Sequence, residues 1–313
     1  MSVQAVPDLD RRLEQHRGEL TAYCYRMLGS PFEAEDAVQD TFIRAWRGID
    51  RFEGRAALRS WLYKIATNVC FDMLKGRERR ARPMDLGGAQ APVLENLSER
   101  PETTWLLPMP DPAETVVDRE TVRLAFVAAL QHLPARQRAA LILCEVLRWQ
   151  ASEAAELLET SVASVNSALQ RARATLGDQD LTAPSAPLGA DERALLERYV
   201  AAFEAYDMDA LTSLIKEDAI QSMPPYDMWL AGRDDIFTWW LGPGIGCKGS
   251  RVIAAGSANG SPAYGQYKID PEGGHAPWAL QVVELSGGVI GELTFFLDTA
   301  ALFPLFGLPP HLD

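Results

Sequence analysis

The sequence has no apolar run long enough to cross a membrane and no cysteine pattern that binds a metal. A span needs about 18 or more consecutive apolar residues, and none occurs. The four cysteines, Cys24, Cys70, Cys144 and Cys247, are scattered, without CxxC or metal-ligand spacing. No apolar stretch follows a basic start near the N-terminus, so no signal peptide is predicted. These absences predict a cytoplasmic protein with free thiols and with no metal, cofactor or membrane partner.

Positive charge is scarce in the chain as a whole but not in every part of it. The net charge is −13. Segments 1–83, 84–120, 121–176 and 177–313 carry net charges of +3, −6, +2 and −12. Within the first, residues 51–82 hold 9 basic and 3 acidic side chains. Two short basic segments in an acidic chain favour nucleic-acid binding by those segments alone.

The order of periodic and irregular stretches predicts a multidomain protein. Helical patterns cover 9–28, 30–48 and about 57–80, and Ser30, Pro31 and Glu33 form a helix start with a capping box. A proline-rich stretch, helices, a second proline-rich stretch, a helix pair and several β-like runs then follow. The sequence therefore predicts an all-α domain at 9–82, a linker at 83–112, an all-α domain at 113–177, a linker at 178–190 and an α+β domain at 191–313.

The helix predicted at 30–48 has two unlike sides. Ala34, Val38, Thr41 and Ala45 form a narrow buried stripe at helical spacing. The other side mixes polar and charged residues with large apolar ones; it consists of Asp36, Gln39, Asp40, Ile43, Trp46 and Arg47. Two readings remain open: a helix buried on two sides in a bundle, or a docking face for another protein.

Basic and aromatic residues alternate in the segment that follows. Arg55, Arg59, Lys64 and other basic groups are interleaved with aromatic residues that include Trp61. Basic groups follow a phosphate backbone and aromatics stack on unpaired bases, while Asn68 is placed to hydrogen-bond a base edge. The alternative is an ordinary amphipathic helix with a solvated basic side.

Residues 149–176 have the outline of a helix-turn-helix. Helices are predicted at 151–158 and 162–176 around a tight turn at 159–161, with Val162, Val165, Leu169, Ala172 and Leu176 as the buried stripe. The opposite face carries small polar residues and then arginines: Ser164, Ser167, Gln170, Arg171 and Arg173. Such a face suits a recognition helix in the major groove. The alternative is an αα-hairpin with a solvated arginine face.

Together these motifs carry a resemblance to a known family. "SPFEAEDAVQDTFIRAWRGIDRFEGRAALRSWLYKIATNVCFDMLKGRERR" resembles region 2, and "LPARQRAALILCEVLRWQASEAAELLETSVASVNSALQRARATL" resembles region 4, of the extracytoplasmic-function (ECF) sigma factors of bacterial RNA polymerase. The chain beyond residue 190 is similar to the SnoaL-like, NTF2-like α+β domain of the SigG/SigJ-type members. It lacks the DGGGK-type loop of one large subgroup with such extensions.

The resemblance implies a role for each surface. Asp36, Gln39, Asp40, Phe42 and Trp46 match the positions that dock on the clamp helices of the polymerase β′ subunit, and the β flap is a further implied contact. Arg55, Arg59, Trp61, Lys64 and Asn68 match the part that captures the opened −10 promoter element. Ser164, Ser167, Gln170, Arg171 and Arg173 match the face that reads the duplex −35 element. A sigma factor needs no catalytic group, so no enzyme activity is expected.

The C-terminal domain leaves more hypotheses open. The NTF2-like fold forms a cone whose candidate pocket residues here are Trp229, Trp240, Tyr267, His275 and Asp298. Asp298 is a candidate general base, against the alternative of a solvent-exposed strand end, and fold analogy does not make an enzyme. The segment 177–313, with a net charge of −12, is tethered to basic domains and is predicted to regulate them in place of a separate anti-sigma factor.

Two other functions compete with a sigma factor. One is a helix-turn-helix regulator that senses a small-molecule ligand through its C-terminal domain. The other is a SnoaL-like cyclase or isomerase fused to a DNA-binding module. The apolar end of the chain, 301–312, is predicted either to dock on another domain or to be disordered.

Overall fold

The computed structural model describes residues 5–52, 57–111, 123–176 and 188–313, which fall into two compact units. The first unit comprises Met1–Arg80, Leu106–Pro108 and Leu124–Ala183. The second comprises Ala81–Trp105, Met109–Arg123 and Pro184–Asp313. The chain therefore changes unit several times between the two helical segments. No helix among the described residues is long and apolar enough to cross a membrane.

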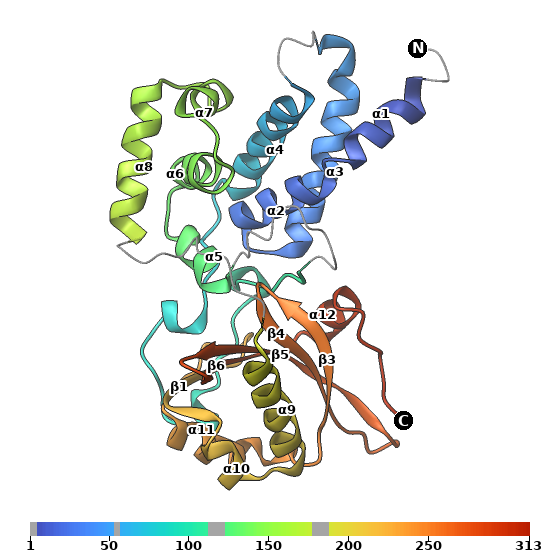
Figure 1. The fold of residues 1–313 in the computed structure, drawn as a ribbon, viewed down its shortest axis with the longest axis vertical. Coiled ribbons are helices and arrows are strands. Elements are labelled where there is room, and N and C mark those ends of the chain that lie inside the picture. The colour runs from blue at the N-terminus through green and yellow to red at the C-terminus, as the bar shows by residue number, and fades with distance from the viewer. Residues whose placement is uncertain (1–4, 53–56, 112–122, 177–187) are drawn as a thin grey trace. The chain divides into compact units, whose positions relative to one another are not determined.

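The described part of the first unit is all helical (Figure 1). Its elements are α1 (Ala5–Glu14), α2 (Arg17–Leu28), α3 (Pro31–Gly48), a 3₁₀ turn η1 (Ile49–Arg51), α4 (Leu58–Leu74), α5 (Leu124–Gln131), α6 (Ala135–Leu141), a π-helical turn η5 (Ile142–Val146), α7 (Ala151–Leu157) and α8 (Val162–Leu176). The single helix predicted at 9–28 is wrong, because α1 ends at Glu14 and α2 begins at Arg17. The helix-turn-helix lies where it was predicted, and Glu159 makes its turn with φ 51°.

Local chemistry explains where α2 ends and α3 begins. Gly29 ends α2 in the left-handed region, at φ 76°, where a side chain is disfavoured. Ser30 Oγ accepts a 3.4 Å hydrogen bond from the backbone N–H of Glu33, and Pro31 occupies the first helical position. The predicted cap is confirmed.

Within the first unit, a buried arginine joins the helices α5–α8 to the helices α1–α4. Arg138 on α6 is 4% exposed. Its guanidinium donates to the backbone oxygen of Met27 on α2, to Gln131 Oε1 at 2.7 Å, and to the backbone oxygens of Gln131 and Leu133 at 3.2 and 3.1 Å. Burial lowers the pKa of Arg138 to about 10. The hydrogen bonds compensate for placing this charge in the interior.

The second unit is an α+β domain built on a six-stranded sheet of order β2-β1-β6-β5-β4-β3 (Figure 1). The strands are β1 (Ile215–Ser222), β2 (Trp229–Ala231), β3 (Arg251–Ala258), β4 (Ser261–Ile269), β5 (His275–Ser286) and β6 (Val289–Phe296). β1 and β6 are parallel and the other neighbours are antiparallel. The helices are α9 (Ala190–Ala205), α10 (Met208–Thr212), α11 (Arg233–Leu241) and α12 (Thr299–Leu305), with a 3₁₀ turn η6 (Pro243–Cys247).

The two faces of the sheet bury different partners. On one face α9, α10 and α11 close an apolar core that includes Tyr199, Phe203 and Trp240. A buried hydrogen-bonded row crosses this face, from Tyr199 Oη to Gln281 at 2.9 Å and from Gln281 to Gln266 at 3.0 Å. Tyr267, next to Gln266 on β4, faces the other side and packs on Phe303 of α12.

The C-terminal end packs within its own unit. Leu312 forms an antiparallel bridge with His275, through hydrogen bonds of 2.7 and 3.0 Å. Tyr267 Oη donates to the backbone oxygen of Pro309 at 2.8 Å. Neither predicted alternative, docking on another domain or disorder, describes this arrangement.

Most of the segment predicted as the first linker is part of the second unit. Residues 81–105 form a loop that closes on itself, since the backbone N–H of Ala81 donates to the oxygen of Thr104 at 2.8 Å. The loop contains three short 3₁₀ turns, η2 (Pro83–Asp85), η3 (Leu94–Asn96) and η4 (Glu102–Thr104). We call residues 81–105 the linker loop.

The linker loop is held on the C-terminal domain by backbone and side-chain contacts. Its Gln90 N–H donates to Trp229 O at 3.0 Å, and its Arg100 N–H donates to Pro225 O at 2.9 Å. Arg100 also pairs with Asp227 at 2.9 Å, and Trp229 Nε1 donates to Gly87 O at 2.9 Å.

Further along the chain, Met109 and Asp111 attach the linker to the β3–β4 turn. Asn259 exchanges two hydrogen bonds with Met109, at 2.9 and 3.0 Å. Asp111 Oδ2 accepts from Gly260 N–H at 2.8 Å, and the Asp111 N–H donates to Ser257 O at 3.0 Å.

Candidate polymerase and promoter interfaces

Helix α3 presents the mixed acidic and apolar face that its sequence predicted. Ala34, Val38, Thr41 and Ala45 are fully buried on one side. On the other side Trp46 is 44% exposed and Ile43 is 43% exposed. Asp36 and Gln39 are exposed, while Asp40 and Phe42 are partly buried. The first unit therefore buries α3 on one side only, and its other side is available to a partner.

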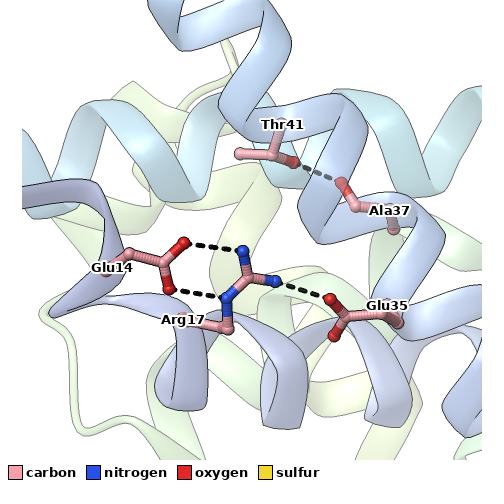
Figure 2. Close-up of polar contacts among 5 residues, drawn as sticks. All are labelled: Glu14, Arg17, Glu35, Ala37 and Thr41. Atoms are coloured by element: carbon pink, nitrogen blue, oxygen red, sulfur yellow. Dashed lines mark hydrogen bonds and ion pairs between the residues drawn. The ribbon is translucent and has the colours of Figure 1, made fainter. Parts of the chain in front are cut away.

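Polar contacts fix the position of α3 against α1 and α2 (Figure 2). Arg17 at the start of α2 donates two bonds of 2.7 Å to Glu14 and one of 2.5 Å to Glu35 on α3. The Arg17 guanidinium also lies 5.1 Å from the centre of the Phe42 ring. Thr41 Oγ1 donates to the backbone oxygen of Ala37 at 2.7 Å, so its hydroxyl is satisfied inside the bundle.

The −10 candidates on α4 are already engaged within the first unit. Trp61 packs against Phe52, with ring centres 4.9 Å apart and ring planes inclined at 32°. Arg59 pairs with Glu19 at 2.7 Å. Lys64 pairs with Glu159 at 2.8 Å, whereas Asn68 is exposed. Arg55 lies outside the described residues.

Two residues that were not predicted as site residues, Glu159 and Trp149, bring the helix-turn-helix against α4. Glu159, in the turn between α7 and α8, supplies the carboxylate for Lys64. Trp149, just before α7, packs edge-on to Tyr63 of α4, with ring centres 5.2 Å apart, and lies 5.7 Å from the Arg59 guanidinium. The second group of helices thus covers part of the candidate −10 face. This covering of the −10 face depends on contacts between segments far apart in the sequence, so no local pattern in the sequence predicts it.

The candidate −35 residues share the exposed face of α8. Ser164, Ser167, Gln170, Arg171 and Arg173 are all exposed. Ser161 caps the helix, its Oγ accepting from the Ser164 N–H at 3.1 Å, and Arg173 pairs with Glu145. Val165, Leu169 and Ala172 are buried as predicted. Val162 is 44% exposed, because it lies in the first turn, beyond the packing surface.

The cone of the C-terminal domain is nearly filled by its own side chains. Its lining consists of Phe203, Tyr206, Gln221, Met223, Trp239, Trp240, Gly244, Cys247, Trp278 and Phe295. The void that they leave is about 20 Å³, room for roughly one water molecule. Gln221 accepts from Trp240 Nε1 at 2.7 Å, and Tyr206 Oη donates to Trp240 O at 2.6 Å, so these polar groups are satisfied by the protein.

The structure does not bring the five predicted pocket residues together. Trp240 lines the void, but Trp229 lies under the linker loop. Tyr267 is on the opposite face of the sheet, and His275 pairs with Leu312. Asp298 caps α12, accepting from the Ala301 N–H at 3.3 Å.

Comparisons with known proteins agree with this architecture. Residues 13–80 match the model of Sigma-70 region 2, and residues 123–176 match that of Sigma-70, region 4. The chain is 44% identical over 320 aligned residues to the ECF RNA polymerase sigma factor SigG of Mycobacterium tuberculosis, covering 97% of this chain and 85% of SigG. The chain belongs to the ECF sigma factors.

Other ECF sigma factors resemble smaller or more distant parts. SigW of Bacillus subtilis is 31% identical over 164 residues, which are 52% of this chain and 84% of SigW. The crystal structure of SigJ of Mycobacterium tuberculosis has the same overall fold, with a TM-score of 0.59, 21% identity and coverage of 96% of this chain and 98% of SigJ. That coverage includes the C-terminal α+β domain. The predicted fold class, two helical sigma domains followed by an α+β domain, is therefore confirmed.

Proposed function

We propose that the C-terminal domain regulates this ECF sigma factor through the linker, in place of a separate anti-sigma factor. The partners in this proposal are core RNA polymerase, through the β′ clamp helices and the β flap, and promoter DNA. The observation that carries it is the docking of the linker loop and of Met109 and Asp111 on the C-terminal domain. A domain that holds the connection between two DNA-reading domains influences how far apart they can move.

The exposed face of α3 is the proposed polymerase contact. Trp46 supplies an apolar anchor of the type that dominates protein interfaces. Asp36 and Gln39, exposed on the same helix, add polar groups that suit a basic partner helix. Asp40 already pairs with Arg44 at 2.8 Å, so it must exchange that partner to contribute.

Promoter recognition, in this proposal, requires the first unit to open. Lys64, Arg59 and Trp61 are the proposed −10 contacts together with Asn68, and three of the four are engaged with other side chains. DNA would have to displace Glu159 from Lys64. The −35 face of α8 is exposed and needs no such release. In the closed first unit, the −35 face of α8 can bind duplex DNA, but the −10 face of α4 cannot bind the melted strand. This closed unit is therefore an inactive state.

Run-off transcription with core polymerase tests the regulatory role. Asp227→Asn removes the charge that pairs with Arg100, and Trp229→Phe removes the N–H bonded to Gly87. Glu272→Gln is the matched control, since Glu272 is an exposed acid in the turn before β5, away from these contacts.

We expect more promoter-specific transcript from the double variant than from the wild type, and none of this gain from the control. Equal transcript from all three would remove the Asp227 and Trp229 contacts from regulation. Absence of any promoter-specific transcript with every form would remove the sigma activity itself.

We infer that the domain performs no reaction in its cone. General acid–base chemistry needs a titratable group beside the substrate. Among the described residues that line the void, none is a carboxylate or a histidine, and about 20 Å³ admits no organic molecule. We therefore assign neither a substrate nor a small-molecule ligand to this cavity.

A further inference from the structure

A groove separate from the cone runs along α9, between this helix and the strands β3 and β4 of the same unit (Figure 1). Its volume is about 490 Å³, and sites for small molecules usually measure about 300–1,000 Å³. None of the residues that line the groove also lines the void of the cone. The groove therefore offers the room for a small molecule that the cone lacks.

Small and apolar side chains form the walls of this groove. Leu196, Val200 and Ala201 lie on one stripe of α9, at the spacing of successive helical turns. Val252 and Ala254 form the opposite wall on β3. Leu196 and Val252 are buried, whereas Ala201 and Ala254 are exposed, so the apolar walls remain open to solvent. A ligand that covers such walls removes apolar surface from water, which favours binding.

Two polar groups of the lining are left without a partner. Among the residues that the structure describes, the exposed carboxylate of Glu197 on α9 forms no hydrogen bond or ion pair, and the hydroxyl of Tyr264 on β4 forms no hydrogen bond. Burial and the charge of Glu197 raise the pKa of Tyr264, in keeping with their places on one groove. An aromatic ring attracts a cation over its face, and a carboxylate adds Coulombic attraction.

The other two charged residues of the lining are engaged by the backbone. Glu204 Oε1 accepts a hydrogen bond from the Val252 N–H at 2.7 Å. Arg193, near the start of α9, donates from Nε to Gly189 O at 3.4 Å. The carboxylate of Glu197 is therefore the charge of the lining that a ligand can pair with directly.

We propose that this groove binds a small amphipathic cation, an aliphatic or aromatic body that carries an amine or quaternary ammonium group. The body covers the apolar walls on α9 and β3, and the cationic group lies between Glu197 and the ring of Tyr264. The net charge of −12 on segment 177–313 favours a cation over an anion of the same shape.

The groove shares the β3–β4 hairpin with the attachment of the linker. Gly256 and Pro262 line the groove, and the turn between them bonds to Met109 and Asp111. A ligand bound to the hairpin stabilises the conformation that holds the linker. Its effect on transcription rests on the proposed function, whereas its binding does not.

Titration of the full chain with octyltrimethylammonium, followed by the amide signals in NMR spectra, tests the site. The reporters are the amides of Ala201, Ala254 and Tyr264, which line the groove. Octanesulfonate is the matched probe, because it has an alkyl chain of the same length and the opposite charge. We expect the cation to shift the reporter signals and to bind at least about 10-fold more tightly than the anion.

Two pairs of variants locate the binding. Glu197→Gln removes the charge without changing the size of the side chain and should weaken the cation by about 2- to 5-fold, the usual size for an exposed ion pair. Its control is Glu272→Gln, at an exposed acid outside the lining. Ala201→Leu narrows the groove and should weaken the cation by about 5-fold or more. Its control is Ala194→Leu, at an exposed alanine of the same helix outside the lining.

Three results would overturn the proposal. One is a set of shifted signals that avoids the groove, and another is binding of octanesulfonate as tight as that of the cation. The third is an unchanged affinity for the cation in both Glu197→Gln and Ala201→Leu.

Run-off transcription tests the consequence for the linker separately. We expect the cation to lower the amount of promoter-specific transcript from the wild type but not from Ala201→Leu. An unchanged amount of transcript at saturating cation would overturn the coupling of the groove to the linker and leave the binding site in place. The site and the proposed function can therefore fail separately.

Discussion

Replacing Arg138 with leucine should destabilise the first unit by about 3 kcal/mol. The guanidinium contacts four acceptors, one from Met27 on α2 and three from Gln131, the last residue of α5, and Leu133, just after it. Lowering the pKa of Arg138 to about 10 by burial corresponds to a cost of about 3 kcal/mol for the charge, which the variant recovers. Against this, four buried acceptors lose their donor at about 1–3 kcal/mol each. Some of them regain water, so the net loss is of the size found on breaking a buried charged network.

Urea unfolding of the full chain, followed by the fluorescence of the tryptophans, measures this loss. Arg136→Leu is the matched control on the same helix. Arg136 is exposed, its guanidinium lies 5.7 Å from the centre of the Phe71 ring, and it makes one long bond of 3.4 Å to Leu158 O. Its loss should cost under about 1 kcal/mol. An Arg138→Leu variant as stable as the control would refute the reasoning, since it would mean that the buried arginine contributes no more than a surface one.

Four further predictions concern function. Trp46→Ala should weaken binding to core polymerase by about 2 kcal/mol in a fluorescence titration, because an exposed aromatic anchor is lost; unchanged affinity would remove it from the interface. Arg171→Ala should lower promoter affinity and reduce the salt slope by about one, and an unchanged slope would exclude a phosphate contact. Glu159→Gln should increase capture of single-stranded −10 DNA in anisotropy measurements, since it frees Lys64; no change would mean that the pair does not compete with DNA. Asn259→Gly should broaden the range of spacer lengths accepted in run-off transcription, because it keeps the backbone conformation at φ 52° and removes the acceptor for Met109; an unchanged range would separate this contact from promoter choice.

Features with a local cause were predictable from the sequence. The helix-turn-helix boundaries follow from apolar spacing and a polar turn, and α7 and α8 agree with them to within one residue. The β5–β6 hairpin follows from Gly287 and Gly288, both of which adopt positive φ, 65° and 80°. The unlike sides of α3 follow from its own periodicity.

Features that depend on distant partners were not predictable in this way. β1 was missed because Lys216, Glu217 and Asp218 are all exposed, which breaks the alternation expected of a strand. Tyr267 was assigned to the cone, but the register shifts between Gln266 and Tyr267, and the ring packs on Phe303 of a helix near the end of the chain. The linker was predicted from its prolines, yet its docking depends on Pro225, Asp227 and Trp229, more than 100 residues away.

The points at which the linker is attached determine what its release can do. The linker loop begins and ends at neighbouring residues, Ala81 and Thr104, so freeing it alone adds little reach between the two sigma domains. The attachment of Asp111 limits the reach between the sigma domains more directly. Twelve residues, 112–123, separate Asp111 from α5, and a chain of that length spans at most about 45 Å. If the contacts of Met109 and Asp111 with the β3–β4 turn break, the last fixed residue before α5 is Leu107. Its N–H donates to Gly29 O at 3.0 Å, and its oxygen accepts from Tyr25 Oη at 2.8 Å. The reach to α5 then grows to about 60 Å, a gain of about 15 Å or roughly four base pairs of duplex. We therefore expect any effect of the linker on promoter spacing to come from the contacts of Met109 and Asp111 with the β3–β4 turn, and not from the linker loop alone.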